Sequence, residues 1–273
     1  MYENYSVLMS VYIKEKPEFL RESMQSIYDQ TIPTDDFILI CDGPLTEELN
    51  DVIEEMHNKF QNRLRVHRLN NNVGLGNALN VGVRLCKNEL VARMDSDDIS
   101  KSFRCEQQIN KFKEFSELAI VSATIEEFGE SPEKLDNKKI LPETHEQILE
   151  YAKHRNPFNH PCVMYKKSSV IQAGGYQDFY LLEDYYLWIR MLLRGLKGYN
   201  IQETLLLMRT GAGLYNRRSG GKYALSQMKL FRYMYKNNFI SFYQCIVSII
   251  TRGIVALIPN KARVFIYQHF LRK

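Results

Sequence analysis

Three carboxylates stand close together in the segment Asp95-Ser96-Asp97-Asp98, directly after the apolar run Leu90–Met94. Carboxylates at this spacing repel one another, and a bound divalent cation relieves that repulsion. Their hard oxygens suit Mg²⁺ or Mn²⁺. Ligands of open α/β sheets also bind beyond the carboxyl ends of strands, where this segment is expected. The segment therefore predicts a metal site, and a solvated acidic turn is the alternative.

Three further acidic residues have either a chemical or a purely structural role. Asp42 follows a second strand-like run, Phe37–Cys41, and is expected to face the same crevice as Asp95; a simple turn is the alternative. Glu183 and Asp184 begin an apolar helix. An acid there can act as a general base for a reacting hydroxyl, or it can merely favour the helix dipole.

The remaining candidates are weaker. His160 lies between two prolines and can contact phosphate or an acceptor, or be a hydrogen-bonded structural residue; Trp188 can line a sugar pocket or belong to the core. Arg217 and Arg218 suit an anionic diphosphate or lipid headgroups. Leu79 stands where a dinucleotide fingerprint needs glycine or alanine, so the glycines before it indicate a tight turn and a helix start.

The elements that must position these residues alternate between strand-like and helix-like runs. Strands are expected at Tyr5–Tyr12, Phe37–Cys41, Leu64–Leu69, Leu90–Met94, near Leu118–Glu126 and at Cys162–Tyr165. Helices are expected from Pro17, from a Thr46 cap, from about Gly76 to Lys87, and from Ser102 to about Phe115. This alternation predicts an α/β fold with a mostly parallel sheet and helices on both faces. We expect a mobile loop at 129–139 and a largely helical remainder.

Charge is distributed unevenly along the 273 residues, of which 45% are apolar. No Asp or Glu follows Glu203, whereas 12 of the 36 Lys and Arg do, so residues 1–203 carry 24 basic and 32 acidic side chains. This difference in charge between the two ends of the chain indicates an anionic partner, either a membrane or a nucleic acid. Long apolar runs interrupt the basic residues, which favours a membrane interface and predicts no nucleic-acid partner.

The end of the chain is predicted to form a separate helical, basic extension. Glycines and arginines replace the apolar pattern near Gly211–Gly221. We therefore expect one domain over 1–221, with halves of about 1–100 and 101–221, and an extension over 222–273. Ile240–Ile258 is marginal as a membrane-spanning segment. An amphipathic helix at the membrane interface fits better, and a helical pair packed on the core or at a homodimer interface is the alternative.

Cysteine usage and the start of the chain fit a reducing cytosol. The five cysteines are dispersed and form no CxxC pair, which argues against a disulfide framework or a cysteine metal cluster. The first residues run into strand-like sequence without a basic, apolar leader. The expected location is cytoplasmic, peripheral on the inner face of the cell membrane.

Taken together and in this order, the motifs resemble glycosyltransferase family 2, whose members have the GT-A fold. The resemblance covers about Tyr5 to Gly221 and is carried by DGPLTEEL, RMDSDD, NHP, GGY, LLEDYYLW and RRSGG. It is similar in particular to bacterial enzymes of O-antigen, capsule and exopolysaccharide assembly. The sequence departs from the family pattern at Cys41, where a second Asp is common, and at Leu79, where an Arg is frequent. No clear C-terminal His completes a metal shell.

The resemblance implies roles for individual residues. Tyr12 and Asp42 contact the base of the nucleotide, and Asp95 lies by its ribose or diphosphate. Asp97 binds the metal, with Asp95 as the second candidate ligand. Asp184 is the catalytic base, with Glu183 beside it. Arg217 and Arg218 are candidates for the diphosphate, while His160 and Trp188 are weak candidates for the acceptor.

The implied reaction is inverting transfer of a hexose from a UDP-sugar to an undecaprenyl-diphosphate-linked saccharide. The donor is expected to be UDP-galactose or UDP-glucose, with UDP-N-acetylhexosamines close behind, and the product a β-glycoside. Two alternatives stay open: a sugar nucleotidyltransferase, and a basic nucleic-acid-binding protein. The segment Ser10–Glu15 lacks the glycine-rich loop that a nucleotidyltransferase favours.

Overall fold

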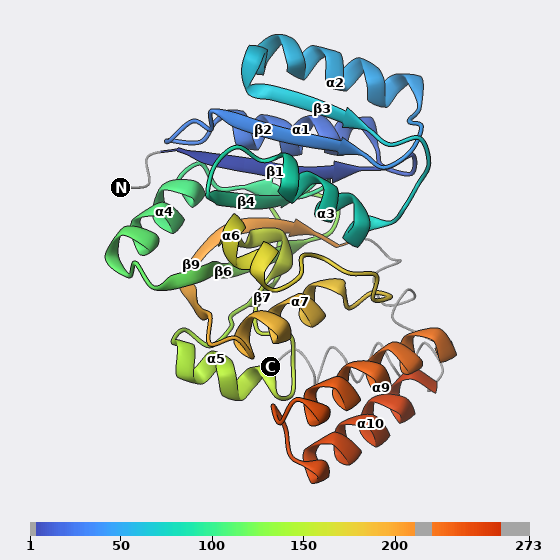
Figure 1. Cartoon of the computed structure of the whole chain (residues 1–273). Coiled ribbons are helices and arrows are strands. Elements are labelled where there is room, and N and C mark those ends of the chain that lie inside the picture. Colours follow the sequence, from blue (N-terminus) through green and yellow to red (C-terminus); the bar gives the residue numbers. More distant parts are fainter. Residues whose placement is uncertain (1–3, 211–219, 258–273) are drawn as a thin grey trace.

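The computed structural model describes residues 4–210 and 220–257 and contains a nine-stranded sheet with helices on both faces (Figure 1). The strands are β1 (Tyr5–Val11), β2 (Asp36–Cys41), β3 (Leu64–Arg68), β4 (Leu90–Asp95), β5 (Ile99–Ser100), β6 (Leu118–Phe128), β7 (Leu135–Lys139), β8 (Met164–Lys166) and β9 (Lys197–Arg209). The α-helices are α1 (Pro17–Tyr28), α2 (Glu47–Phe60), α3 (Leu75–Leu85), α4 (Arg104–Glu114), α5 (His145–Ala152), α6 (Lys167–Gln172), α7 (Glu183–Leu192), α9 (Gly220–Lys236) and α10 (Phe242–Leu257). Short 3₁₀ turns are η1 (Gln61–Arg63) and η2 (His160–Cys162).

The first half of the sheet follows the order β3-β2-β1-β4, and all of these pairs are parallel. The central strands are buried on both faces, as expected for parallel strands between two helical layers. Along β1, Val7, Met9 and Val11 belong to one hydrophobic cluster and Leu8 to the other, on the opposite face. The predicted α/β fold with a mostly parallel sheet is thus confirmed.

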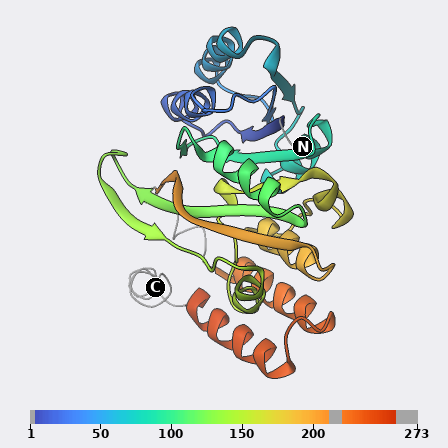
Figure 2. The same cartoon turned by 90° about the vertical axis from the view of Figure 1, so that its left-hand side faces the viewer.

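The second half continues through β8, β6, β9 and β5. β8 is antiparallel to both β4 and β6, while the long strands β6 and β9 are parallel. Figure 2 shows these two strands running side by side across the middle of the molecule. The sheet therefore brings the N-terminal half of the chain and a strand from residues 197–209 into one layer.

Two expectations about this half were wrong. The polar stretch expected to be a loop contains β7, which pairs with the end of β6 through Ile125 and Lys139. The remainder expected to be largely helical contains β9, a 13-residue strand. In both cases the partner strand is β6, and pairing with it, rather than local composition, decides that the segment is a strand.

The C-terminal helices α9 and α10 pack on the domain rather than apart from it. Inner residues of both, including Leu230, Phe231 and Cys245, belong to the hydrophobic cluster that also contains Leu8 and Trp188. The boundary predicted near Gly211–Gly221 falls largely outside the described residues and stays a prediction. Within 4–210 and 220–257, no helix is both long and apolar enough to cross a bilayer.

Candidate active site

Three candidate residues lie at the carboxyl ends of neighbouring parallel strands. Cys41 of β2 pairs with Val11 of β1, and Ser10 of β1 pairs with Asp95 of β4. Tyr12 directly follows β1 and is exposed. Asp42 directly follows β2. These residues therefore lie along one edge of the sheet, because parallel strands end on the same side, and the crevice expected there stays a prediction.

Asp42 fixes the turn that precedes α3. Its buried carboxylate accepts hydrogen bonds from the backbone amides of Val73 (2.7 Å) and Gly74 (3.0 Å) and from the side chain of Asn72 (3.0 Å). Gly43 follows with φ +91°, and an added Cβ would lie 2.8 Å from the backbone of Asn72. Only glycine allows this approach. The structure thus gives Asp42 a turn-fixing role, and its contact with a nucleotide base stays a prediction.

The aspartate cluster predicted after β4 is present. Asp95, Asp97 and Asp98 each offer a carboxylate oxygen, and these oxygens lie within 4.8 Å of one another. Burial and the charges of Asp95 and Glu15 raise the pKa of Asp97 to about 7. The carboxyl of Asp98 is fully buried, and its Oδ2 has no hydrogen-bond partner among the described residues.

This donor set fits a hard divalent cation. Burial and the charge of Asp95 raise the pKa of both Asp97 and Asp98, so these two carboxyls need a nearby positive charge to remain ionised together. An orphaned buried carboxylate oxygen is costly unless something pairs with it. Part of the compensation comes from within the chain, since the buried Arg93 forms a bidentate ion pair with Asp95. Asp97 and Asp98 therefore retain the greater need for a cation.

Sequence reasoning missed two arginines of this region. Arg93, on β4 two residues before Asp95, points to the same face of the strand, and that spacing was a usable signal. Arg209 ends β9; its guanidinium donates to the Asp97 carbonyl (3.0 Å) and to Glu22 (2.5 Å). Its backbone amide donates to Asp98 Oδ1 (2.8 Å). The unexpected strand β9 thus holds the aspartate cluster in place.

Glu183, the first residue of α7, lies against the first turn of α3. An added Cβ at Gly76, in the first turn of α3, would lie 3.2 Å from the Cβ of Glu183. Glycine at this position therefore lets the start of α7 approach the start of α3. Burial and the neighbouring charge of Asp184 raise the pKa of Glu183 to about 7. The charge of Asp95 acts in the same direction, so Glu183 and Asp95 are near enough to interact electrostatically.

Asp184 is held by an amide. Asn156 Nδ2 donates to its Oδ2 at 2.6 Å, and its Oδ1 accepts from the backbone amide of Tyr185. His160 Nδ1 lies 4.0 Å from Asp184, and His160 Nε2 lies 3.0 Å from the Tyr176 hydroxyl. Burial, aided by the charge of Arg93, holds the pKa of His160 well below its ordinary value. His160 is therefore neutral near pH 7 and forms no ion pair with Asp184.

Trp188 and Leu79 belong to the hydrophobic core. Trp188 is fully buried, with Phe158, Tyr165 and Tyr176 around it, so the core alternative describes it and the sugar-pocket expectation is corrected. Leu79 is also fully buried in the core, which explains why the dinucleotide fingerprint is broken there. Arg217 and Arg218 lie outside the described residues, and their predicted contacts stay predictions.

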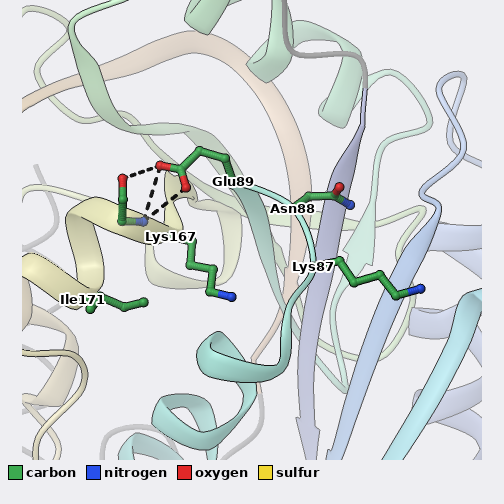
Figure 3. Close-up of a pocket in the computed structure, with 6 residues that line it drawn as sticks. Lys87, Asn88, Glu89, Lys167 and Ile171 are labelled. Atoms are coloured by element: carbon green, nitrogen blue, oxygen red, sulfur yellow. Dashed lines mark hydrogen bonds between the residues drawn. The ribbon is translucent and has the colours of Figure 1, made fainter.

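A surface pocket lies away from this site, at the opposite end of β4 (Figure 3). It is lined by Lys87, Asn88, Glu89, Lys167, Ser168 and Ile171. Glu89 accepts hydrogen bonds from Ser168 at the start of α6, and Lys167 Nζ donates to the Cys86 carbonyl (2.6 Å) at the end of α3. These polar groups thus join two helix ends and are not directed at a ligand.

Comparisons with known proteins bear on this geometry. The family model "Glycosyl transferase family 2" matches residues 6–174. A UDP-Gal:alpha-D-GlcNAc-diphosphoundecaprenol beta-1,3-galactosyltransferase of Escherichia coli is 42% identical over 98% of this chain and 97% of its own. The amylovoran biosynthesis glycosyltransferase AmsE of Erwinia amylovora is 36% identical over 97% and 98%.

Solved structures share the fold at low sequence identity. TarS 1–349 of S. aureus in complex with UDP-GlcNAc has a TM-score of 0.70 at 16% identity, covering 92% of this chain and 72% of that one. The mannosyltransferase PcManGT of Pyrobaculum calidifontis, in complex with GDP-Man and Mn²⁺, has a TM-score of 0.68 at 12% identity, covering 98% and 81%.

Proposed function

Because the chain belongs to glycosyl transferase family 2, we propose that it transfers a hexose, with inversion, from a UDP-sugar to a lipid-diphosphate-linked saccharide. Galactose is the first candidate hexose and glucose the second, with UDP-N-acetylhexosamines as further donors to test. The proposed acceptor is an undecaprenyl-diphosphate-linked saccharide, and the product a β-glycoside used in a surface polysaccharide such as an O-antigen.

One observation in this chain supports the proposal beyond the family membership. Glu183, the neighbour of the candidate base Asp184 at the start of α7, lies beside Gly76, and its pKa is raised in part by the charge of Asp95. This observation supports the proposal that the candidate base and the aspartate cluster serve one site. The donor and the acceptor are suggested by the name of the E. coli relative, which matches almost the whole chain. That name also specifies a β linkage, which inversion of an α-linked UDP-sugar produces.

The family membership makes the chain a glycosyltransferase and replaces the two alternatives left open by the sequence. A nucleotidyltransferase releases pyrophosphate, whereas this family's reaction releases a nucleoside diphosphate. The basic C-terminal region, which suggested nucleic acid, needs another partner. We propose an anionic membrane surface, with the enzyme cytoplasmic and peripheral on the inner face of the cell membrane.

In the proposed mechanism, Asp184 removes the proton of the acceptor hydroxyl as that oxygen attacks the anomeric carbon. Asn156 holds Asp184 Oδ2 and so fixes the direction of the carboxylate. Glu183, with its pKa raised to about 7, is partly protonated at neutral pH and limits the negative charge next to the base. A single displacement from the face opposite the leaving group inverts the anomeric centre, and no protein nucleophile is required.

Asp97 and Asp95 are the proposed ligands of Mg²⁺ or Mn²⁺, with the orphaned Oδ2 of Asp98 beside them. When bound, a divalent cation stabilises the negative charge that develops on the departing diphosphate. Arg209 holds the loop of these aspartates through the Asp97 carbonyl. The chain's own contribution is thus a fixed carboxylate cluster at the strand end.

The test is a transfer assay with the purified full chain and a panel of sugar nucleotides. The acceptor is a GlcNAc-diphosphate lipid, and the released nucleotide and the product linkage are measured. We expect UDP release and a β-linked hexose, both reduced in the Asp184→Asn variant. The matched control is Asp178→Asn, an exposed acid in the same loop region.

Transfer from a donor other than UDP-galactose would change the assigned sugar and keep the reaction class. Retention of the anomeric configuration would contradict the single displacement. Release of pyrophosphate, or no transfer from any UDP-sugar to any lipid-diphosphate saccharide, would refute the proposed function.

A further inference from the structure

Helix α10 packs one side on the domain and carries apolar side chains on the other. Its inner face is occupied, because Cys245 and Ser248 are buried and the Cys245 thiol lies 3.5 Å from the Phe231 carbonyl of α9. Arg252 further ties α10 to the domain through the His154 carbonyl and the Phe231 ring. These contacts hold the helix in place without using its opposite side.

The opposite side is exposed and apolar. Its side chains and their exposed fractions are Phe242 (62%), Tyr243 (75%), Ile246 (39%), Val247 (39%) and Ile250 (54%). Positions 242, 246 and 250 are four residues apart and follow one line along a helix, with 243 and 247 beside it. We call these five residues the outer face of α10. Single exposed apolar residues are common, but a contiguous group on one helix indicates a surface that something covers.

The charges near the outer face of α10 indicate which kind of partner it binds. Within 220–253, the charged residues are Lys222, Lys229, Arg232, Lys236 and Arg252, and no Asp or Glu is present. Lys229, Arg232 and Lys236 are exposed on one side of α9. Phe242 contacts Tyr235 of α9, with ring centroids 5.6 Å apart, so this end of the outer face lies beside the residue that precedes Lys236.

A second copy of the chain would bring two such cationic surfaces together, and like charges repel across an interface. An anionic lipid surface instead attracts each basic residue close to it while its interface accepts aromatic and aliphatic side chains. We propose that the outer face of α10 docks into the interface of an anionic bilayer, with Lys229, Arg232 and Lys236 at the headgroups. This inference rests on the proposed function only in that a lipid-linked acceptor gives the docking a purpose.

The position of the two helices suits that purpose. Figure 1 shows α10 on the outside of α9, at the end of the molecule away from α2. α9 contacts α7 through Tyr233 and Tyr186, whose ring centroids lie 5.0 Å apart. Asp184 lies in the first turn of α7, two residues before Tyr186. Docking through α10 therefore keeps the candidate base close to the layer in which a lipid-linked acceptor is confined.

The experiment is flotation of the full chain with two kinds of vesicle, phosphatidylcholine alone and phosphatidylcholine mixed with phosphatidylglycerol. We expect binding to the mixed vesicles that weakens as salt is added. The Ile246→Gln/Ile250→Gln variant should lower the partition coefficient by about tenfold or more, because two apolar side chains no longer enter the interface. The Arg232→Gln/Lys236→Gln variant should lower it by about fivefold for each charge at low salt.

The matched control is Ile140→Gln/Ile171→Gln, which removes two exposed isoleucines from other parts of the surface and should bind like the original chain. Far-UV circular dichroism and melting temperature check that each variant is folded. Failure of the original chain to float at any salt concentration would overturn the proposal, and so would equal flotation of the α10 and control variants. A dimer in solution that the α10 variant abolishes, without vesicle binding, would assign the face to a second copy instead.

A separate assay with a water-soluble acceptor analogue distinguishes the two proposals. If the chain floats as expected but transfers no sugar, the proposed reaction fails and the docking surface stands. If it transfers sugar to the soluble analogue but never binds vesicles, the docking surface fails and the reaction stands. The α10 variant should retain transfer to the soluble analogue, because its substitutions lie outside the catalytic residues.

Discussion

Asn156 Nδ2 donates a hydrogen bond of 2.6 Å to Asp184 Oδ2, joining the loop before η2 to the first turn of α7. The second oxygen of Asp184 accepts from the backbone amide of Tyr185. The carboxylate is thus held at both oxygens, and its direction depends on residues 28 positions apart in the sequence. A base fixed in this way is pre-organised for proton transfer.

We predict that Asn156→Ala lowers kcat on the order of tenfold to a hundredfold, because a small misplacement of the base is costly. The KM for the sugar nucleotide should change little, since Asn156 is proposed to act through its hydrogen bond to the catalytic base Asp184. Steady-state kinetics with both substrates varied would measure this difference, with the exposed Asn58→Ala on α2 as the control. Unchanged kcat, or a loss explained entirely by a lower melting temperature, would remove Asn156 from the mechanism.

The two acids of α7 are predicted to differ in effect. Asp184→Asn keeps the shape of the side chain but removes the proton acceptor, so kcat should fall by about 10²–10⁴-fold. Glu183→Gln should cost less, because Glu183 is not the proposed base. Donor binding, measured by calorimetry with UDP, should be similar in both. An inactive Glu183→Gln beside an active Asp184→Asn would exchange the two roles.

Stability should depend on pH through Glu183. Burial raises its pKa in the folded chain from the ordinary 4.5 to about 7. Between these values the folded state binds more protons than the unfolded state, so stability falls as pH rises through this window. Glu183→Gln cannot ionise. Its melting temperature minus that of the original chain should therefore increase from about pH 5 to about pH 8.

Thermal unfolding followed by circular dichroism at several pH values measures this difference. The matched control is Glu203→Gln, an exposed acid on β9, for which the difference should stay flat. A pH-independent difference for Glu183→Gln would mean that Glu183 titrates at its ordinary value in the folded chain.

Removal of the cation or of its proposed ligand should abolish transfer and leave the fold intact. We expect Asp97→Ala to retain less than about one percent of the activity, since stabilisation of the leaving diphosphate is worth several kcal/mol. Electron paramagnetic resonance of added Mn²⁺ should show weaker binding than in the original chain. Asp51→Ala, an exposed acid on α2, is the control. Full turnover by Asp97→Ala in excess chelator would exclude this metal site.

The sequence alone predicted much of the fold and part of the site. Runs of apolar residues near strand length, followed by Asp42 and Asp95, predicted β2 and β4 and the acidic residues at their carboxyl ends. Local signals also placed the start of α1 at Pro17 and the start of α2 after Thr46. These features were predictable because the information lies within a few neighbouring residues.

Only the tertiary structure showed which residues that are distant in the sequence come into contact. β9 was missed because its pairing with β6 joins residues 118–128 to 197–209, and Arg209 was missed with it. The core position of Trp188 depends on aromatic residues from four other segments. The closeness of Gly76 and Glu183 depends on α3 and α7 packing in the same hydrophobic cluster.

For the C-terminal helices, too, the sequence determines one part of the description and the tertiary structure another. The sequence determined that residues after Glu203 are cationic and rich in apolar side chains, because composition needs no fold to be read. It did not determine which side of α10 is free. Packing of Cys245 and Ser248 against the domain assigns one side to the core and leaves Tyr243 and Ile250 exposed on the other. Burial is a property of the whole assembled chain, because each contact needs a partner that is distant in sequence.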